Sequence, residues 1–366
     1  MKLLIVTTEK LNVNGVSNVI MNYYRAMDKS DMKIDFVVPN GVRDDFSKEI
    51  KSNNGVIYTI NKRQKNPIGY FLKLYQIIKK NKYDIVHAHG NSSTLAIEML
   101  AAKRAKVPVR IPHGHSSSGK YKFLHKLLRG PFKKSYTHAF ACGEKAGEWL
   151  FGKEPFTIIS NGISYDKFAY NKSIRDQYRM QMNLVDKKVV GHVGHFNFAK
   201  NHDYLMDIFS ELYKKNKDYK LLLVGDGALK SEIEKKAQIL NISEAVLFLG
   251  RRLDIAQLMS AMDIFILPSH FEGVPLSLIE AQAAVLPCFV SENVSKEVKI
   301  TELIQFISLN KSAEDWAKQI DEANDIKRDK IQDTVYSQIS KAGYNIEENA
   351  KTMKMLYNKY LKQEEI

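Results

Sequence analysis

Cysteine is nearly absent from this chain of 366 residues, in which Cys142 and Cys288 stand far apart and outside any CxxC pair. A disulfide framework is therefore excluded, and two reduced, packed thiols of a cytosolic protein are predicted. Long apolar runs are missing as well. The first run, Leu3 to Val6, is too short for a signal peptide, and no segment approaches the roughly 20 apolar residues of a membrane-spanning helix. We therefore expect a cytoplasmic protein whose first run is a buried strand.

Several motifs of cofactor and metal sites are also lacking. No HExxH pattern, no GxGxxG fingerprint and no acidic DxD triplet occurs. His192, His195 and His202 do not have the spacing of a zinc site, which disfavours a metal there. Without a DxD triplet to hold a magnesium–diphosphate unit, no metal cofactor is expected.

Acidic residues are missing from one long segment, 99–143, which carries ten basic residues. Residues 1–165 have 27 Lys and Arg against 12 Asp and Glu, a net charge of +15, and residues 166–366 have 28 against 29, a net charge of −1. Within the first half, GKYKFLHKLLRGPFKK (119–134) mixes six basic residues with large apolar ones. This pattern favours contact with an anionic membrane surface over a solvated basic loop, and Gly130 and Pro131 should end any helix there. No nucleic-acid recognition module is present, so nucleic acid is not expected as a partner.

Strands and helices alternate along the chain in two successive series. The length suggests two domains, at roughly 100–200 residues per domain. The alternation predicts two α/β domains with doubly wound parallel sheets, 1–165 and 166–345, facing a central cleft. A Lys- and Glu-rich C-terminal helix, 346–366, is expected to pack back on the first domain. Ligands of such sheets lie outside the carboxyl ends of the strands, where most of the motifs fall.

The block HFEGVPLSLIEAQA (270–283) places Glu272 and Glu280 on either side of an apolar turn. A helix is expected to begin near Pro275, which suits a first helical position. Its free N–H groups near Val274 and Leu276 form a positive terminus that can hold phosphate without a metal. A carboxylate inside the helix suits the vicinal hydroxyls of a ribose better than phosphate. For the pair alone, a glutamate favoured by the helix dipole and an ordinary surface glutamate remain an equal alternative.

Other glycine-containing strand ends accompany this block. GHVGHFNFAKN (191–201) carries Lys200, a mobile charge suited to a diphosphate, after Gly194, which permits close backbone approach. LNVNG places Gly15 at the turn after the first strand, and VGDG places Gly225 at another strand end. Each glycine alone is a weak signal.

Four histidines lie at the ends of two predicted strands, in His87-Ala-His89 and His113-Gly-His115. A histidine at the carboxyl end of a strand can donate to sugar hydroxyls or to a developing oxyanion. For His87 and His115 taken singly, a histidine that is only hydrogen-bonded within its loop is equally well supported.

Together these segments resemble the retaining glycosyltransferases of family 4, which have the two-domain GT-B fold. The resemblance covers nearly the whole chain. It is strongest over 189–291 and most specific in FEGVPLSLIEAQA, with support from DIVHAHG, SNGI, VGHFNFAKN, LLLVGDG and FLGRRLDIAQLMSAMDIFILPS. Within the family, it is most similar to bacterial enzymes of exopolysaccharide or capsule assembly.

The resemblance implies a role for each matching residue. Glu280 would bind the donor ribose, Glu272 the transferred sugar, and Lys200 the diphosphate. His89 would contact the donor sugar near the reaction centre, with His113 and Asn14 on the acceptor side. The remaining donor-binding residues would be Gly15, His195, Gly225, Arg251, Val274, Pro275 and Leu276.

Three positions depart from the family pattern. Asn14 stands where members commonly have a first glycine, Val285 where a glycine precedes the Leu-Pro pair, and His195 where an arginine is frequent. The last change removes a permanent charge from the diphosphate site. Lys200, Glu272 and Glu280 are present, so an active enzyme is expected.

The resulting expectation is a retaining hexosyltransferase. It would move a sugar from a UDP-sugar to a glycan, often polyprenyl-diphosphate-linked, at the inner face of the cell membrane. Two alternatives remain open: a UDP-N-acetylglucosamine 2-epimerase-like isomerase, and a non-catalytic nucleotide-sugar-binding partner.

Overall fold

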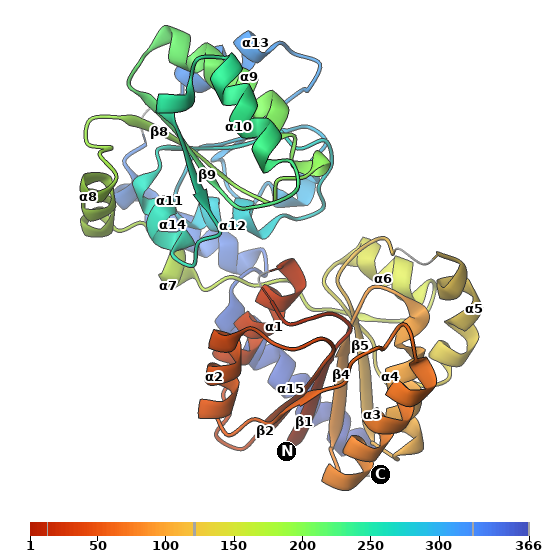
Figure 1. The fold of residues 1–366 in the computed structure, drawn as a ribbon. Coiled ribbons are helices and arrows are strands. Elements are labelled where there is room, and N and C mark those ends of the chain that lie inside the picture. Colours follow the sequence, from red (N-terminus) through yellow and green to blue (C-terminus); the bar gives the residue numbers. More distant parts are fainter. Residues whose placement is uncertain (13, 120–121, 324–325, 365–366) are drawn as a thin grey trace. The chain divides into compact units, whose positions relative to one another are not determined.

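The computed structural model describes every residue except 13, 120–121, 324–325 and 365–366. The chain forms two compact units, residues 1–162 with 346–366, and residues 163–345. The chain thus passes between units after Gly162, three residues before the predicted boundary at 165, and returns after Asn345. Each unit has one parallel sheet between helices (Figure 1), so the predicted architecture of two doubly wound domains is confirmed.

The sheet of the first unit has seven parallel strands in the order β3-β2-β1-β4-β5-β6-β7. The strands are β1 (Lys2–Thr7), β2 (Lys33–Val38), β3 (Ile57–Thr59), β4 (Ile85–His89), β5 (Val109–Gly114), β6 (Phe140–Ala141) and β7 (Thr157–Ile158). The helices are α1 (Gly15–Ala26), α2 (Asp44–Ser52), α3 (Pro67–Asn81), η1 (Ser93–Leu95), α4 (Ala96–Arg104), α5 (Lys122–Lys133), α6 (Glu144–Phe151) and α15 (Ile346–Glu364).

The sheet of the second unit has six parallel strands in the order β10-β9-β8-β11-β12-β13. The strands are β8 (Lys188–Val193), β9 (Tyr219–Val224), β10 (Val246–Gly250), β11 (Ile264–Leu267), β12 (Cys288–Ser291) and β13 (Ile304–Ile307). The helices are α7 (Tyr165–Phe168), α8 (Lys172–Gln181), η2 (Phe198–Lys200), α9 (His202–Lys215), α10 (Lys230–Ile239), η3 (Ser243–Ala245), α11 (Ile255–Ala261), α12 (Leu276–Ala283), η4 (Lys296–Val298), α13 (Ala313–Asp321) and α14 (Arg328–Lys341).

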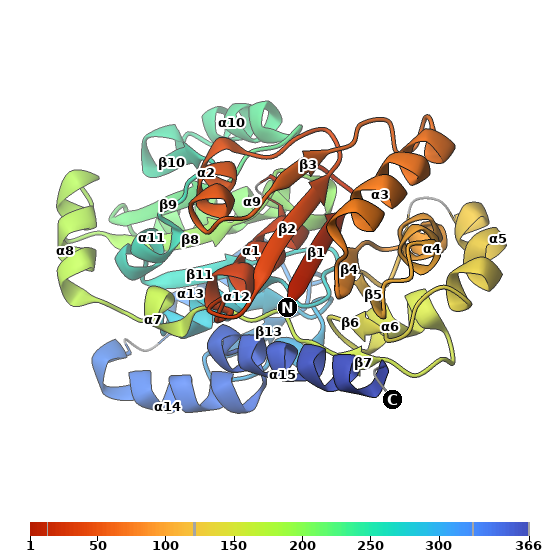
Figure 2. The same ribbon diagram turned by 90° about the horizontal axis from the view of Figure 1, so that it is seen from below.

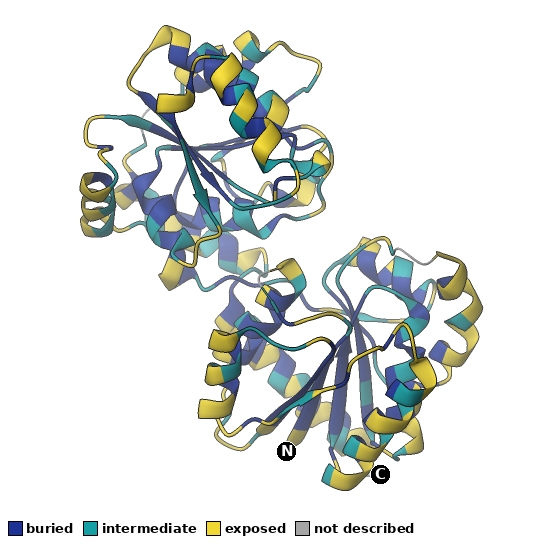
Figure 3. Cartoon of the chain, in the orientation of Figure 1, coloured by how far each residue is buried: buried dark blue, intermediate teal, exposed yellow. Residues whose placement is uncertain are grey.

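The central strands are buried on both faces, as parallel strands covered by helices must be. In β1 and β2 every residue after the first lysine is buried, and all of β4, β11 and β12 is buried. Figure 3 shows this contrast between dark strands and helices with exposed outer faces. The apolar runs that predicted strands therefore form the cores of both units.

The C-terminal helix α15 belongs to the first unit, where it packs against α1 and β5 (Figures 1 and 2). Its apolar stripe buries Met353, Tyr357 and Tyr360, while Leu356 on the same stripe is half-buried. Lys354 pairs with Asp28 at 2.8 Å and Asp31 at 2.5 Å. The helix therefore covers one face of the sheet that carries the histidines.

One sequence expectation about α5 was wrong. The helix continues through Gly130 and Pro131 to Lys133. Proline in a helix removes the hydrogen bond to the carbonyl four residues earlier. That carbonyl belongs to Leu127, whose side chain is 62% exposed, so water can reach this part of the helix. The loss is tolerated there, close to the end of the helix.

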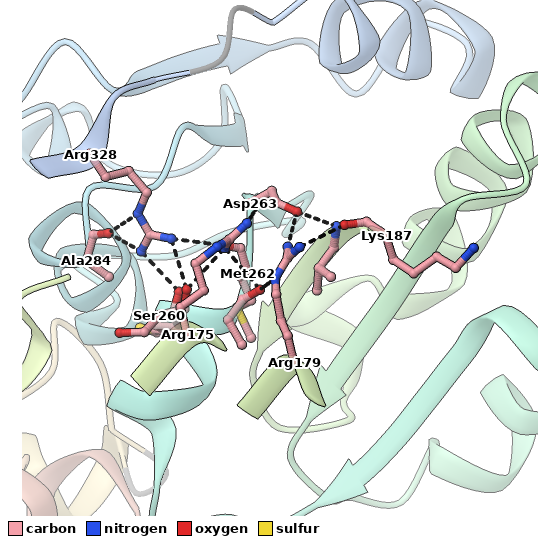
Figure 4. A network of polar contacts seen from close by, with 11 residues as sticks. Arg175, Arg179, Lys187, Ser260, Met262, Asp263, Ala284 and Arg328 are labelled. Atoms are coloured by element: carbon pink, nitrogen blue, oxygen red, sulfur yellow. Dashed lines mark hydrogen bonds and ion pairs between the residues drawn. The ribbon is translucent and has the colours of Figure 1, made fainter. Parts of the chain in front are cut away.

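Three arginines, Arg175, Arg179 and Arg328, make hydrogen bonds along the amino-terminal edge of the second sheet (Figure 4). Arg328 donates to carbonyl oxygens at the C-terminal ends of α11 and α12, and Arg175 and Arg179 donate to the same end of α11. The two α8 arginines also share Asp263, whose carboxylate accepts from the backbone N–H of Val189 at 2.7 Å. Cations at helix C-termini oppose the negative end of the helix dipole. These contacts of the three arginines and Asp263 hold the starts of β8 and β11 in place.

Candidate functional site

The order of strands reverses at one point in each sheet. In the second unit this topological switch point lies between β8 and β11, and in the first unit between β1 and β4. Crevices outside the carboxyl ends of the strands at such points are the usual ligand sites of open α/β sheets. Lys200 follows β8 and Glu272 follows β11, whereas His89 ends β4 and Gly15 follows β1.

Asparagine side chains shape the loop that presents Lys200. Asn197 accepts a hydrogen bond from the backbone N–H of Lys200 at 3.1 Å and so caps the short turn η2. Asn201 adopts a left-handed conformation, with φ of 53°, which asparagine tolerates better than most residues. Its side chain donates to the carbonyl oxygen of Pro268 at 3.0 Å. The loop after β8 is thereby tied to the loop after β11.

The side chains of Lys200 and Glu272 form an ion pair, with 2.8 Å between Nζ and Oε1. Both are largely buried, at 14% and 19% exposure, so solvent screens the pair less than a surface salt bridge. The Lys200 stem runs over Gly194: a Cβ there would lie 3.2 Å from its Cδ and Cε. The backbone N–H of His270 also donates to the carbonyl oxygen of Ala199 at 2.8 Å. Two residues predicted to serve the donor are thus brought together.

The helix α12 begins at Leu276, one residue later than the predicted start, and Pro275 is its N-cap residue. The N-cap conformation of Pro275, with φ of −71° and ψ of 120°, is extended, which places it outside the helix. No hydrogen bond within the described residues uses the backbone N–H of Val274 or Leu276. These two donors lie at the positive end of the helix dipole, where an anion could bind.

Glu280 lies in α12, a little more than one turn after its start, and is half-buried. Burial raises the pKa of its carboxyl group to about 7, although Lys167 acts in the opposite direction. No hydrogen-bond partner or ion pair of the Glu280 carboxylate occurs within the described residues. A half-buried carboxyl group without a partner is poised to accept hydrogen bonds from a ligand.

The remaining donor-side predictions fall on loops of the same edge. Gly225 has a φ of +147°, and a Cβ there would lie 1.9 Å from the carbonyl oxygen of Gly194, so only glycine fits. Arg251 makes a loose ion pair with Asp226, 3.5 Å between Nε and Oδ2, with both side chains about half exposed. His195 is exposed and is the least constrained of the set.

In the first unit, α1 begins at Gly15 with Asn14 as its N-cap residue. The Asn14 side chain accepts from the backbone N–H of Ser17 at 2.9 Å. The backbone of Asn14 is extended, with φ of −148°, so this position does not need the glycine common in the family. Asn14 replaces that glycine with a capping group, and a Cβ on Gly15 would meet nothing within 4 Å. Val13 of the same turn lies outside the described residues.

The four strand-end histidines form one block under α15. His89 and His113 are opposite each other in the register of β4 and β5. His87 Nε2 lies 3.1 Å from His113 Nδ1, and His89 Nδ1 lies 2.9 Å from His115 Nε2. These two hydrogen-bonded pairs stack on each other, with ring centroids 4.2 Å apart for His87 and His89 and 4.3 Å apart for His113 and His115. Tyr357 Oη lies 2.7 Å from His87 Nδ1.

Burial keeps these imidazoles neutral. It lowers the pKa of His87 to about 3 and that of His115 to about 4, and it holds the pKa of His89 and of His113 well below 6.5. Both ring nitrogens of His87 have protein partners, but these are Tyr357 of α15 and His113 of β5, so the bonds do not lie within the loop of His87 as the alternative expected.

The nitrogen atoms of His87, His89 and His113 lie within 4.8 Å of one another, which makes them the one group with metal-ligand proximity among the described residues. Around tetrahedral zinc, ligand nitrogens lie roughly 3.3 Å apart and point at a common centre. Here His89 stacks face-on with His87, so their in-plane lone pairs run side by side without converging. The geometry fits a hydrogen-bonded block better than a metal centre.

The histidines of the second unit do not gather as ligands either. His192 Nδ1 bonds the carbonyl oxygen of Ile266 at 2.8 Å, and His202 packs between the rings of His192 and Phe196. His195 is exposed.

Two family models match this chain. "Glycosyltransferase Family 4" matches residues 13–167, and "Glycosyl transferases group 1" matches residues 174–344. The protein EpsF of Bacillus subtilis (strain 168) is 34% identical over 363 residues, which cover 95% of this chain and 94% of that protein. This chain belongs to the family 4 glycosyltransferases of the GT-B fold.

The comparisons also give a second bacterial relative and a solved structure with the same fold. The "UDP-Gal:alpha-D-GlcNAc-diphosphoundecaprenol alpha-1,3-galactosyltransferase" of Escherichia coli is 32% identical over 236 residues, 60% of each chain. The crystal structure of Anabaena Alr3699/HepE in complex with UDP and glucose superposes with a TM-score of 0.71, at 17% identity, over 99% of this chain and 98% of that one. The glycosyltransferase is thus of the kind that acts in bacterial polysaccharide synthesis.

Within the described part of the glycosyltransferase, no helix is long and apolar enough to cross a bilayer. Cys142 and Cys288 are not joined by a disulfide bond; Cys288 is buried and Cys142 is half-buried.

The sequence did not reveal the residues that hold the predicted site residues in place. Asn197 and Asn201 fix the Lys200 loop, and Tyr357 supports the histidine block from a helix 270 residues away in sequence. The asparagines had a usable signal, since asparagine favours caps and left-handed turns. The only sequence signal for Tyr357 was its position on the apolar stripe of its helix, and any packed helix has such a stripe.

The raised pKa of Glu280 gives a testable stability prediction. In the unfolded chain the pKa of this carboxyl group lies near its ordinary value of 4.5, and in the native state it lies near 7. Between these pH values the native state retains a proton that the unfolded state has lost, so this group makes stability fall as pH rises from about 4.5 to about 7. Glu280→Gln removes that slope. We expect its melting temperature, relative to wild type, to rise over this window and to level off above it.

The matched control is Glu302→Gln, which alters an 89% exposed carboxylate in the same unit. Its melting temperature should follow wild type at every pH. A difference between Glu280→Gln and wild type that stays constant from pH 4.5 to 8 would contradict the assignment.

Proposed function

We propose that the enzyme transfers a sugar from a UDP-sugar to a hydroxyl group of a glycan carried on a polyprenyl diphosphate, with retention of anomeric configuration. The name of the Escherichia coli relative supports both substrate classes, because it gives a UDP-sugar donor and a diphosphoundecaprenol-linked acceptor. The UDP and glucose bound by the structurally similar Anabaena protein support the donor class.

The observation that carries the donor proposal is the ion pair of Lys200 and Glu272 beside the free amide end of α12. A diphosphate leaving group builds up negative charge as the glycosidic bond breaks. A preorganised ammonium group and backbone N–H donors stabilise that charge without reorganisation during the reaction. Glu272 holds the Lys200 ammonium at this edge before a ligand arrives, and its carboxylate can then accept from hydroxyls of the transferred sugar.

Glu280 would accept from the ribose hydroxyls of the same nucleotide. Its carboxyl group lies in α12 and has no protein partner among the described residues, which leaves its oxygens for the ligand. An ionised carboxylate accepts from two vicinal hydroxyls, whereas the protonated form loses one acceptor position.

The proposal includes catalysis without a divalent metal. Charge on the diphosphate would be balanced by Lys200 and the amides of Val274 and Leu276. The chemistry then depends on positioning and on leaving-group stabilisation, and the acceptor hydroxyl attacks the same face that the diphosphate leaves. The departing phosphate takes the proton of that hydroxyl, so no protein nucleophile is invoked.

The membrane part of the proposal concerns α5. Phe123 and Leu127, four residues apart on this helix, are 79% and 62% exposed, and Leu124 between them is 41% exposed. Basic residues alternate with them at 122, 126, 129 and 133, whereas Lys120 lies outside the described residues. Exposed apolar rings and leucines flanked by lysines suit the interface of an anionic bilayer, where a lipid-linked acceptor would be found.

Lys200→Gln tests the donor site. The substitution keeps the length of most of the side chain and removes the charge, so we expect kcat to fall roughly 10²- to 10³-fold, the cost of one preorganised transition-state donor. UDP release in the presence of a membrane lipid extract measures turnover. A screen of UDP-sugars identifies the donor to be used.

Lys235→Gln is the matched control, because Lys235 is an exposed lysine of the same unit outside the site. It should retain wild-type turnover. Wild-type turnover of Lys200→Gln would refute the diphosphate assignment. Conversion of a UDP-sugar to its epimer without an acceptor would identify an isomerase, and UDP binding without any turnover would identify a non-catalytic binder.

The double variant Phe123→Ser/Leu127→Ser tests membrane contact. It removes the two most exposed apolar side chains of α5 and leaves every charge in place. We expect co-flotation with vesicles containing phosphatidylglycerol to fall at least tenfold, while turnover with a water-soluble acceptor stays unchanged. Ile239→Ser, which removes a 78% exposed side chain of α10, should float as wild type does. Equal flotation of all three proteins would exclude α5 as the contact.

A further inference from the structure

One ring of the histidine block, that of His89, has a nitrogen atom that solvent can reach. His113 Nε2 and His115 Nδ1 are sealed from solvent and have no hydrogen-bond partner among the described residues. His89 differs: its Nε2 makes no hydrogen bond with a described residue and is not among these solvent-inaccessible atoms, although the residue as a whole is only 5% exposed. Of the two hydrogen-bonded pairs, the His89–His115 pair therefore presents a nitrogen to the outside.

Hydrogen bonding within this pair determines which atom carries the proton of His89. A neutral imidazole has one N–H donor and one acceptor nitrogen, so one ring of the pair must donate to the other. If His89 donated from Nδ1, the proton of His115 would sit on its sealed Nδ1. Buried N–H groups without an acceptor are rarer in proteins than buried acceptors without a donor. The favoured arrangement has His115 donating from Nε2 to Nδ1 of His89.

The loop around His115 is built to keep this ring in place. The backbone N–H of His115 donates to Asn91 Oδ1 at 2.9 Å, and the indole N–H of Trp149 donates to the carbonyl oxygen of Asn91 at 2.8 Å. On the inner side, the ring stacks on His113, whose partner His87 is bonded to Tyr357. The position of His115 is thus set from both sides, as a residue that orients another must be.

We infer that His115 is a positioning residue that holds His89 in the tautomer with its proton on Nε2, so that His89 presents an N–H donor to an oxygen of the substrate. The chemical class of the ligand atom follows from the donor: a sugar hydroxyl or a phosphate oxygen accepts such a bond, and a cation does not. The identity of the substrate rests on the proposed function, whereas the tautomer does not.

The test uses the full chain with ¹⁵N-labelled histidine. Two-bond ¹⁵N–¹H correlation distinguishes the two neutral tautomers, and His89→Gln identifies the signals of His89. Wild type should show the proton on Nε2 of His89, and His115→Ala should show a mixture of tautomers. In His115→Gln the amide N–H can donate to Nδ1 of His89, so the wild-type tautomer should return. His138→Gln, a half-buried histidine stacked on Tyr360 outside the block, should change nothing.

Turnover gives the second readout. We expect His115→Ala to lower kcat roughly tenfold with little change in KM for the donor, and His115→Gln to recover most of the loss. A proton on Nδ1 of His89 in wild type, an unchanged tautomer in His115→Ala, or wild-type kcat in that variant would each overturn the inference. If the wild-type protein proves to have no transferase activity, the proposed function fails, and the correlation spectra still decide the tautomer.

Discussion

The ion pair between Lys200 and Glu272 is the interaction on which the proposed donor site depends. Each side chain is largely removed from water, and the loss of one would leave the other without an opposite charge in a largely buried place. The pair also joins the loops that follow the two central strands of the second sheet. One backbone hydrogen bond and one hydrogen bond from the Asn201 side chain, between the same loops, reinforce it. A site built this way is preorganised: the ammonium group is held at the strand ends by a partner that a sugar can later share.

The histidine block of the first unit differs from this ion pair, because it contains no charged side chains. There the side chains are neutral, closely stacked and hydrogen-bonded to one another, because burial makes protonation costly. In the proposed mechanism, the charged lysine stabilises a diphosphate, and the neutral imidazole of fixed tautomer recognises a particular oxygen. On this proposal, the two units supply different chemistry from equivalent places, the strand ends at their topological switch points.

Most of the sheet architecture could be predicted from the sequence, because parallel strands covered on both faces read as apolar runs between helical patterns. The prediction of helices and strands failed where the local sequence signal was weak or where the surroundings in the fold overrode it. Pro131 did not end α5, since the bond it removes lies on an exposed part of the helix. The strand β13, with the exposed Gln305 in a run of four, and α13 and α14 were not foreseen, although Ser312 and Asp315 form a capping box that marks the start of α13.

The residues of the candidate site could be predicted from the sequence, but the contacts between them could not. The spacing of Glu272 and Glu280 and the place of Lys200 after a strand placed all three near one sheet edge. That Lys200 contacts Glu272, while Glu280 has a raised pKa and no partner among the described residues, depends on loop conformations that sequence periodicity does not encode. The pairing of His89 with His115 likewise depends on the register of β4 and β5, which is set by long-range packing.

A crystal structure of the protein with UDP bound, obtained with and without magnesium, tests the central claim most directly. The account predicts the diphosphate within hydrogen-bonding distance of Lys200 Nζ and of the amides that precede α12. It also predicts the ribose hydroxyls on Glu280, in the same pose with and without the metal. A nucleotide bound away from the ends of β8 and β11, or one whose diphosphate is held through a divalent ion, would contradict it.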